Sequence, residues 1–269
     1  MTPSEQESKR KNWTDEQLKL AIYLYCQLPF GQLHSRNPKI IALANLIGRS
    51  HGSVAMKLVN LASLDPAIRN SGRTGLSNAS ALDRKIWDEF NADWDSYTLE
   101  CEDVLRKLNN TPTLSEKDSQ EEDYTGQTRN ASVEVRVGQN FFRKTVLASF
   151  QYQTGTKKYQ SYCCMSGVSH NRLLVASHIK PWSEEKKHRL NPRNGLCLSA
   201  IHDRAFDCGL ITVQPDLTII VSDELKSRTD EGEQTRHLIE LEGQRIKLPY
   251  RFQPEEEFLS WHNHNIFRG

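Results

Sequence analysis

The stretch that decides the fold spans residues 177–208 and reads SHIKPWSEEKKHRLNPRNGLCLSAIHDRAFDC. It begins at the end of an apolar run, RLLVASHI, which places His178 at the end of a predicted strand. Two asparagines follow, Asn191 and Asn194, and then a second histidine, His202, at the head of a short apolar segment. Polar side chains in this order and spacing indicate a small metal-dependent hydrolytic site.

The sequence around this stretch is predicted to mix strands and helices. The expected strands are SVEVRV at 132–137, RLLVASHI at 172–179, and a hairpin formed by 209–213 and 217–221 around a Gln-Pro-Asp turn. The expected helices are GQNFFRKTVLASFQYQ at 138–153, HDRAFD within the motif, and a last helix that begins near Pro254. An extended segment is expected at 244–252.

The N-terminal third is predicted to be helical. Residues 13–28 contain a complete helix start, because Thr14 can cap the helix and Gln17 stands three residues on to form a capping box. Further helices are predicted at 37–48, 51–64 and 82–94. The first two of these are joined by a three-residue turn that contains Gly48, an arrangement typical of a helix-turn-helix.

In a helix-turn-helix the second helix of the pair enters the major groove and contacts bases with its N-terminal half. The residues expected to contact DNA are Arg49, His51, Ser53, Lys57 and Asn60 on this turn and helix, Arg69 and Arg73 in the following loop, and Lys180 and Arg193 beside the histidine motif. His51, Ser53, Lys57 and Asn60 are expected on the outward face, opposite the apolar side chains. The alternative is a helical bundle whose polar face meets only water.

Composition limits the class of protein. Charged residues make up 26% and hydrophobic residues 37%, as in soluble globular proteins, and the net charge is only +1. The charges are uneven, with acids gathered at 114–123 and bases at 180–193, and local asymmetry is what phosphates respond to. No apolar run approaches the roughly 20 residues of a membrane span, and no signal peptide is recognised. We therefore expect a cytoplasmic protein without a membrane partner, with its six cysteines as free thiols.

These patterns predict an α+β protein of two domains. The expected boundaries are a helical DNA-recognition domain at 1–108, a flexible acidic linker at 109–131 and a second domain at 132–269. The linker is predicted from its polar, acid-rich composition and its near lack of aliphatic residues.

In the order His178, Asn194, His202, and in the words HIKPW, NPRNGL and HDRAFD, the decisive stretch resembles the HNH nuclease motif. The segments RVGQNFFRKTVL and EEEFLSWHNHNIF look like bacterial HNH proteins of restriction-endonuclease type, so the resemblance covers most of 132–269. The N-terminal helices, with their opening Trp-Thr, are similar to a Myb-like or SANT module.

The resemblance implies a ββα-metal fold and a role for each motif residue. His178 would be the general base, Asn194 would orient it through its backbone, and His202 would bind one divalent metal ion. Asp207 is the preferred second ligand because the ending H-x-x-x-F-D is typical of this HNH branch, and Asp203 remains an alternative.

One position departs from the family pattern. HNH proteins often have an acidic residue or a histidine just before the base, whereas this chain has Ser177, a poor ligand. The metal ion is therefore expected to keep more water, or Asp207 substitutes for the missing ligand. An oxygen-rich shell of this kind suits Mg²⁺, or Mn²⁺, at one ion per active site. A structural zinc ion is disfavoured, because Cys163, Cys164, Cys197 and Cys208 do not form two Cys-x-x-Cys pairs; buried thiols are the favoured interpretation.

The resulting hypothesis is a bacterial endonuclease that cuts double-stranded DNA, of restriction type, dependent on sequence or on a modified base. One site of this kind cuts one strand, so a homodimer is expected for a double-strand break. Two alternatives stay open. One is a DNA-binding regulator whose HNH domain has lost catalysis, with Ser177 as the first sign, and the other is a nonspecific nuclease.

Overall fold

The computed structural model describes residues 12–70, 76, 78–109, 126–155, 158–185, 187–227 and 233–269, with the backbone alone for 126–137 and 233–235. Helices form much of this part of the chain, and short antiparallel strand pairs form the rest of its regular structure, as expected of an α+β protein.

The first elements of the chain are all helices among the described residues. They are α1 (Asp15–Cys26), the 3-10 turn η1 (Phe30–Gln32), α2 (Pro38–Leu46), α3 (His51–Ala62), α4 (Pro66–Asn70), α5 (Ala81–Ala92) and α6 (Trp94–Leu108). Local sequence explains the starts. Thr14 and Gln17 form the predicted capping box of α1, and the Ser50 side chain accepts the Ser53 N–H at the start of α3. Gly48, at φ +67°, ends the turn between α2 and α3 in the left-handed region that glycine adopts most readily.

The sequence-based prediction differs from the structure at two helices, α6 and α7 (Gly126–Ser149). Asp93 ends α5 and caps α6, a separate helix that the sequence patterns did not indicate. The predicted strand at 132–137 is wrong, because these residues lie inside α7. The linker was predicted at 109–131; residues 110–125 lie outside the described part, and α7 already begins at Gly126.

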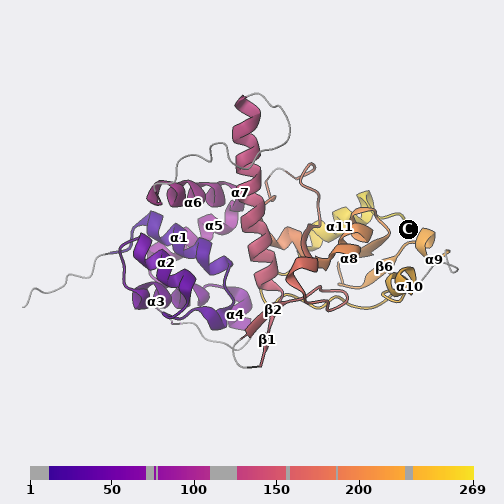
Figure 1. Ribbon diagram of the computed structural model, residues 1–269, viewed down its shortest axis with the longest axis horizontal. Coiled ribbons are helices and arrows are strands. Elements are labelled where there is room, and N and C mark those ends of the chain that lie inside the picture. Colours follow the sequence, from indigo (N-terminus) through magenta and orange to yellow (C-terminus); the bar gives the residue numbers. More distant parts are fainter. Residues whose placement is uncertain are drawn as a thin grey trace, which may run out of the picture.

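Helix α7 stands between the two groups of elements. In Figure 1 it runs as a long magenta helix with the indigo and purple helices on one side and the orange and yellow elements on the other. It contacts α6 on the first side and β2, β3 and β4 on the second. Phe142 and Val146 of this helix are buried, as is Phe150 directly after its end.

The C-terminal elements form three two-stranded antiparallel sheets with short helices around them. The strands are β1 (Gln151–Thr154) with β2 (Lys158–Ser161), β3 (Leu174–His178) with β4 (Gly195–Ser199), and β5 (Ile211–Val213) with β6 (Ile219–Val221). The helices are η2 (Asn171–Leu173), η3 (Pro192–Asn194), α8 (Ala200–Asp207), α9 (Asp223–Lys226), α10 (Glu233–Ile239) and α11 (Glu256–Asn265). The hairpin β5–β6 and the terminal helix α11 confirm the predictions for these segments.

One continuous hydrophobic cluster joins the N-terminal helices to the C-terminal elements. Tyr23 of α1 stacks on Phe141 of α7 with ring centroids 4.8 Å apart, and Trp94 of α6 meets Phe252 edge-on at 5.3 Å. Trp87 and Trp94 are buried in this cluster. Among the described residues, none of the helices combines the length and apolar character needed to cross a bilayer.

A buried arginine adds a polar connection between the two ends of the chain. Arg251 is fully buried, and its guanidinium donates to the carbonyl oxygens of Tyr25, Cys26 and Leu28, at the end of α1. A cation at a helix C-terminus is favourable because the last carbonyls carry partial negative charge. The last turn of α1 has no basic residue of its own, so a residue more than 220 positions away supplies this charge.

Candidate functional site

The decisive stretch folds as two antiparallel strands followed at once by a helix. In the β3–β4 pair, His178 is opposite Gly195 and Ser177 is opposite Leu196. The loop 179–194 connects the strands, and α8 begins directly after β4 and packs on both strands. This is the ββα order that the family resemblance implies, with His178 at the end of the first strand and His202 on the helix.

The imidazole of His178 is held on three sides. Its ring stacks on Phe142 of α7, with centroids 3.9 Å apart and planes 4° from parallel, and it meets Trp182 edge-on at 5.7 Å. Its Nε2 lies 2.8 Å from the carbonyl oxygen of Arg189. A carbonyl oxygen can only accept, so Nε2 carries the proton and Nδ1 keeps its lone pair. Burial lowers the pKa of His178, although the Arg189 carbonyl opposes this change, so the neutral ring is favoured.

Gly195 makes this stacking possible. A Cβ atom at this position would lie 2.6 Å from Cγ2 of Val146 and 2.8 Å from Cζ of Phe142. Any larger residue would therefore push the ring on which His178 stacks. The glycine in the word NPRNGL thus has a packing role directly beside the histidine.

Asn194 positions the loop rather than the histidine ring. Its side-chain Oδ1 accepts the Lys180 N–H at 2.8 Å, and its Nδ2 donates to the Lys180 carbonyl at 3.1 Å and to that of His188 at 3.4 Å. Its own carbonyl accepts the Ile179 N–H. The sequence-based expectation was that the Asn194 backbone orients His178, but the carbonyl in contact with the ring belongs to Arg189.

The loop that carries Arg189 is braced by that residue's own side chain. The Nε of Arg189 donates to the carbonyl oxygens of Trp182 at 3.0 Å and Glu185 at 2.7 Å, and its guanidinium lies over the Trp182 ring. The sequence patterns did not single out Arg189 or Trp182. Both lie in an irregular loop, where no spacing rule indicates which side chains come into contact.

On α8, the Nδ1 atom of His202 is held by two side chains. The Ser199 hydroxyl lies 2.5 Å from Nδ1, and the Sγ of Cys163 lies 3.8 Å from it. Burial acts to raise the pKa of Cys163, but hydrogen bonds from His202 and Ser166 outweigh it and lower the pKa to about 6. Nε2 is therefore the ring atom left for a ligand. Ser199 precedes α8 and stands three residues before His202, a spacing that could have revealed this contact from sequence.

Two carboxylates lie on the same short helix. Burial raises the pKa of Asp203, with the Ser177 hydroxyl opposing the rise. Burial and the neighbouring charge of Asp203 raise the pKa of Asp207, with Arg204 opposing. The Oγ of Ser177 is buried and, among the described residues, has no hydrogen-bond partner of normal geometry. Ser177 is thus turned toward α8, whereas His178, the next residue, is stacked against α7.

The structure brings together some of the predicted site residues and not others. His202 contacts Ser199 and Cys163, and Asp203 lies close to Asp207, but the ring contacts of His178 involve none of the α8 residues. Within the described ranges, no three His, Cys, Asp or Glu side chains gather closely enough to hold a metal ion. All six cysteines are free thiols, and all but Cys208 are buried.

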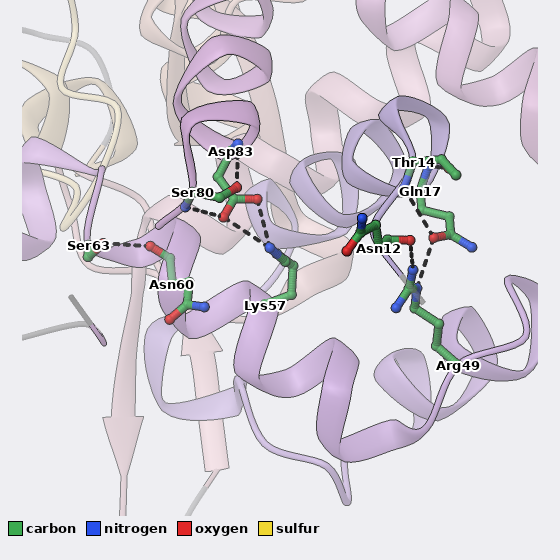
Figure 2. Close-up of polar contacts among 9 residues, drawn as sticks. All are labelled: Asn12, Thr14, Gln17, Arg49, Lys57, Asn60, Ser63, Ser80 and Asp83. Atoms are coloured by element: carbon green, nitrogen blue, oxygen red, sulfur yellow. Dashed lines mark hydrogen bonds and ion pairs between the residues drawn. The ribbon is translucent and has the colours of Figure 1, made fainter. Parts of the chain in front are cut away.

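The residues predicted to read DNA from α3 take two different positions. The prediction that Lys57 and Asn60 face outward is wrong, because each is only 8% exposed. The Nζ of Lys57 lies 2.8 and 2.9 Å from the two carboxylate oxygens of Asp83, which also accepts the Ser80 N–H (Figure 2). Asn60 uses its backbone carbonyl to accept the Ser63 hydroxyl.

The other predicted DNA contacts are more accessible, and several have partners within the chain. Arg49 donates to Gln17 and to the Asn12 carbonyl (Figure 2). It also lies over the Trp13 ring. His51 is exposed beside Asn45, Ser53 is partly buried and Arg69 is exposed, whereas Arg73 lies outside the described residues. Lys180 pairs with Glu185 at 3.1 Å, and Arg193 with Glu255 at 3.7 Å.

A comparison with family models agrees with this geometry. Residues 163–214 match the HNH endonuclease family. The matched HNH segment starts at Cys163, which contacts His202, and contains β3, the loop, β4 and α8. The match implies a hydrolase that acts on DNA. No curated protein matches the chain.

Proposed function

We propose that this protein is a metal-dependent endonuclease that hydrolyses phosphodiester bonds in double-stranded DNA, with His178 as its general base. The observation that carries the proposal is the contact between Nε2 of His178 and the Arg189 carbonyl, at the end of β3 within the HNH segment. This contact leaves Nδ1 unprotonated. A neutral imidazole with one free nitrogen is the form that can take a proton from water.

The chain's own residues support this proton transfer in several ways. Phe142 and Trp182 fix the plane of the His178 ring, and the side chain of Asn194 fixes the loop that supplies the carbonyl. Burial favours the neutral ring near pH 7, because it lowers the pKa of His178. General-base catalysis of this kind contributes about 10²- to 10⁴-fold to a rate.

The residues of α8 fit a hydrated divalent cation better than an enclosed one. The charge of Asp203 raises the pKa of Asp207, and the buried hydroxyl of Ser177 has no hydrogen bond of normal geometry among the described residues. His202 would hold the ion through Nε2, with Asp207 or Asp203, and water would complete the shell. Oxygen-rich donors favour Mg²⁺ or Mn²⁺. When bound, such an ion stabilises charge on the phosphate and the leaving oxygen.

The N-terminal helices are the proposed DNA-recognition part. Among the residues of α3 predicted to contact DNA, the accessible ones are at the N-terminal end, where His51 is exposed and Ser53 partly so, and Arg69 of α4 is exposed. Lys57 and Asn60 are excluded from direct base contact in this form by their burial. We further propose a restriction-type role, directed at a sequence or a modified base, and a homodimer for cutting both strands.

The test is cleavage of supercoiled plasmid with Mg²⁺ or Mn²⁺, with excess EDTA as the metal-free arm. His178→Ala should abolish cutting and leave DNA binding intact, whereas His264→Ala, at an exposed histidine of α11, should cut normally. Cutting by the His178 variant at the wild-type rate would remove this residue from the mechanism. Parallel digestion of plain, methylated and hydroxymethylated DNA, with the fragment ends sequenced, tests the restriction role.

A second candidate is a DNA-binding regulator with a lapsed HNH site. It is favoured by Ser177 at the position before the base and by the lack of a three-ligand metal group among the described residues. Retarded migration of DNA without any nicked product, with either metal ion, would support it. A smear instead of discrete fragments would indicate nonspecific cutting, and nicked circles that never become linear at any protein concentration would contradict the homodimer.

A further inference from the structure

Asp95, at the start of α6, contacts the loop that holds His178. Its carboxylate accepts two backbone N–H groups of this loop, that of Arg189 at 3.2 Å and that of Leu190 at 2.6 Å. These contacts join residues more than 90 positions apart, one in the N-terminal helices and the others in the HNH segment. Both N–H groups need an acceptor, and here an ionisable side chain from another part of the chain supplies it.

The peptide between Arg189 and Leu190 is used on both of its sides. Its N–H, from Leu190, donates to Oδ1 of Asp95, and its carbonyl oxygen, from Arg189, accepts from Nε2 of His178. A charge-assisted hydrogen bond is about twice as strong as a neutral one. It also polarises the peptide, so that the carbonyl on the other side becomes a better acceptor. Carboxylate, peptide and imidazole thus form one chain of hydrogen bonds.

We propose that Asp95 is a positioning residue for His178, acting through the Arg189–Leu190 peptide to hold the ring with its proton on Nε2. This rests on the nuclease function proposed above, because it assigns Asp95 to the site of the proposed base. The N-terminal helices therefore supply part of the catalytic site as well as a surface for DNA.

Burial, together with the charge of Asp93, raises the pKa of Asp95 above its ordinary value, and the N–H groups of Leu190 and Arg189 and the nearby His188 oppose this rise. The guanidinium of Arg189 is turned away, toward the Trp182 and Glu185 carbonyls. Among the described residues, the His178 ring makes its hydrogen bond to the Arg189 carbonyl, so the polarisation of that one peptide acts directly on the ring.

The variants are Asp95→Ala and Asp95→Asn, with Asp93→Asn as the matched control. Asp93 is the N-cap of the same helix and accepts from Ser96, so its replacement weakens α6 without touching the loop. Alanine removes both acceptors. Asparagine keeps the shape of the side chain and one acceptor oxygen but loses the charge. This variant therefore still tests the proposal if the alanine variant does not fold.

The first readout is the ¹⁵N spectrum of the His178 ring, which distinguishes a proton on Nε2 from one on Nδ1 without any need for activity. Wild type should show a single form with the proton on Nε2, and Asp95→Ala should show a mixture of forms. The second readout is plasmid cleavage. Asp95→Ala should lower kcat by about ten- to a hundredfold, as outer partners of active-site histidines do, with KM and DNA affinity within about twofold of wild type.

Asp95→Asn should lie between wild type and the alanine variant, and Asp93→Asn should match wild type in both readouts. A His178 ring that keeps its single form in Asp95→Ala would overturn the proposal, as would an equal loss in Asp93→Asn. A wild-type protein that cuts no DNA would refute the proposed function alone, because the ring spectrum of Asp95→Ala still tests the positioning role.

Discussion

Replacement of Lys57 by alanine tests whether this lysine stabilises the fold, as the structure indicates, or contacts DNA, as the sequence pattern suggested. In the structure, this lysine forms a buried ion pair with Asp83, at 2.8 Å, with side-chain exposures of 10% and 0%. Lys57→Ala leaves the Asp83 carboxylate buried, where it still accepts the Ser80 N–H. Removing one member of a buried pair costs about 3–5 kcal/mol, because the other charge stays desolvated.

For a chain of this size, about 2–4 °C is lost per kcal/mol, so the melting temperature should fall by about 6–20 °C. Thermal unfolding followed by circular dichroism measures this loss. Lys85→Ala is the matched control, since Lys85 forms only exposed contacts with Asp15 and Glu89, and its loss should be under about 0.5 kcal/mol.

The double variant Lys57→Met, Asp83→Asn should recover most of the lost stability, because neither buried charge remains while an acceptor for the Ser80 N–H is kept. DNA affinity, measured at a temperature where the single variant is folded, should be close to that of wild type. If Lys57→Ala melted within about 1 °C of wild type and lost DNA affinity, the lysine would face DNA and the buried pair would be refuted.

Three further perturbations test other parts of the structure. Gly195→Ala should displace the Phe142 ring, destabilise the fold by about 1–3 kcal/mol and reduce plasmid cleavage, and a variant that cuts normally would contradict the tight packing beside His178. Burial lowers the pKa of His262 from 6.5 to about 4, so the unfolded chain takes up the proton first and stability falls as the pH drops from 6.5 toward 4. The loss from this residue by pH 5 is about 2 kcal/mol in urea unfolding. His262→Gln should make the slope shallower by that amount, with His178 still contributing, whereas His264→Gln should keep the wild-type slope. Arg251→Met should remove this donor from three carbonyl oxygens at the end of α1, although that of Tyr25 keeps the Leu28 N–H and that of Leu28 keeps the Tyr250 hydroxyl. The expected cost is about 1–3 kcal/mol, and an unchanged urea midpoint would show that water replaces the guanidinium.

Local signals in the sequence predicted most of the helix starts. The capping box at Thr14 and the cap at Ser50 involve residues three apart, so they can be recognised without tertiary information. The strand prediction for SVEVRV failed because alternating valines fit either a strand or one side of a helix, and here the long helix α7 continues through them.

In the site, too, features set by neighbouring residues were predicted, whereas contacts between distant residues were missed. The order of His178, Asn194 and His202 predicted the ββα unit, because the motif is contiguous in the chain. The outward position of Lys57 was mispredicted, although the lysine falls at helical spacing between Val54 and Leu61 on the apolar stripe, which is a signal for burial. The contacts of Asp95 and Arg251 cross most of the chain, and no spacing rule relates such residues.

Because the guanidinium of Arg251 binds the carbonyls at the end of α1, this helix and the segment that carries the arginine complete their polar contacts only in each other's presence. A fragment that contains α1 but ends before Arg251 would leave the helix end without its buried cation. The α1 helix and the Arg251 segment are therefore expected to gain their native stability together, in one cooperative step.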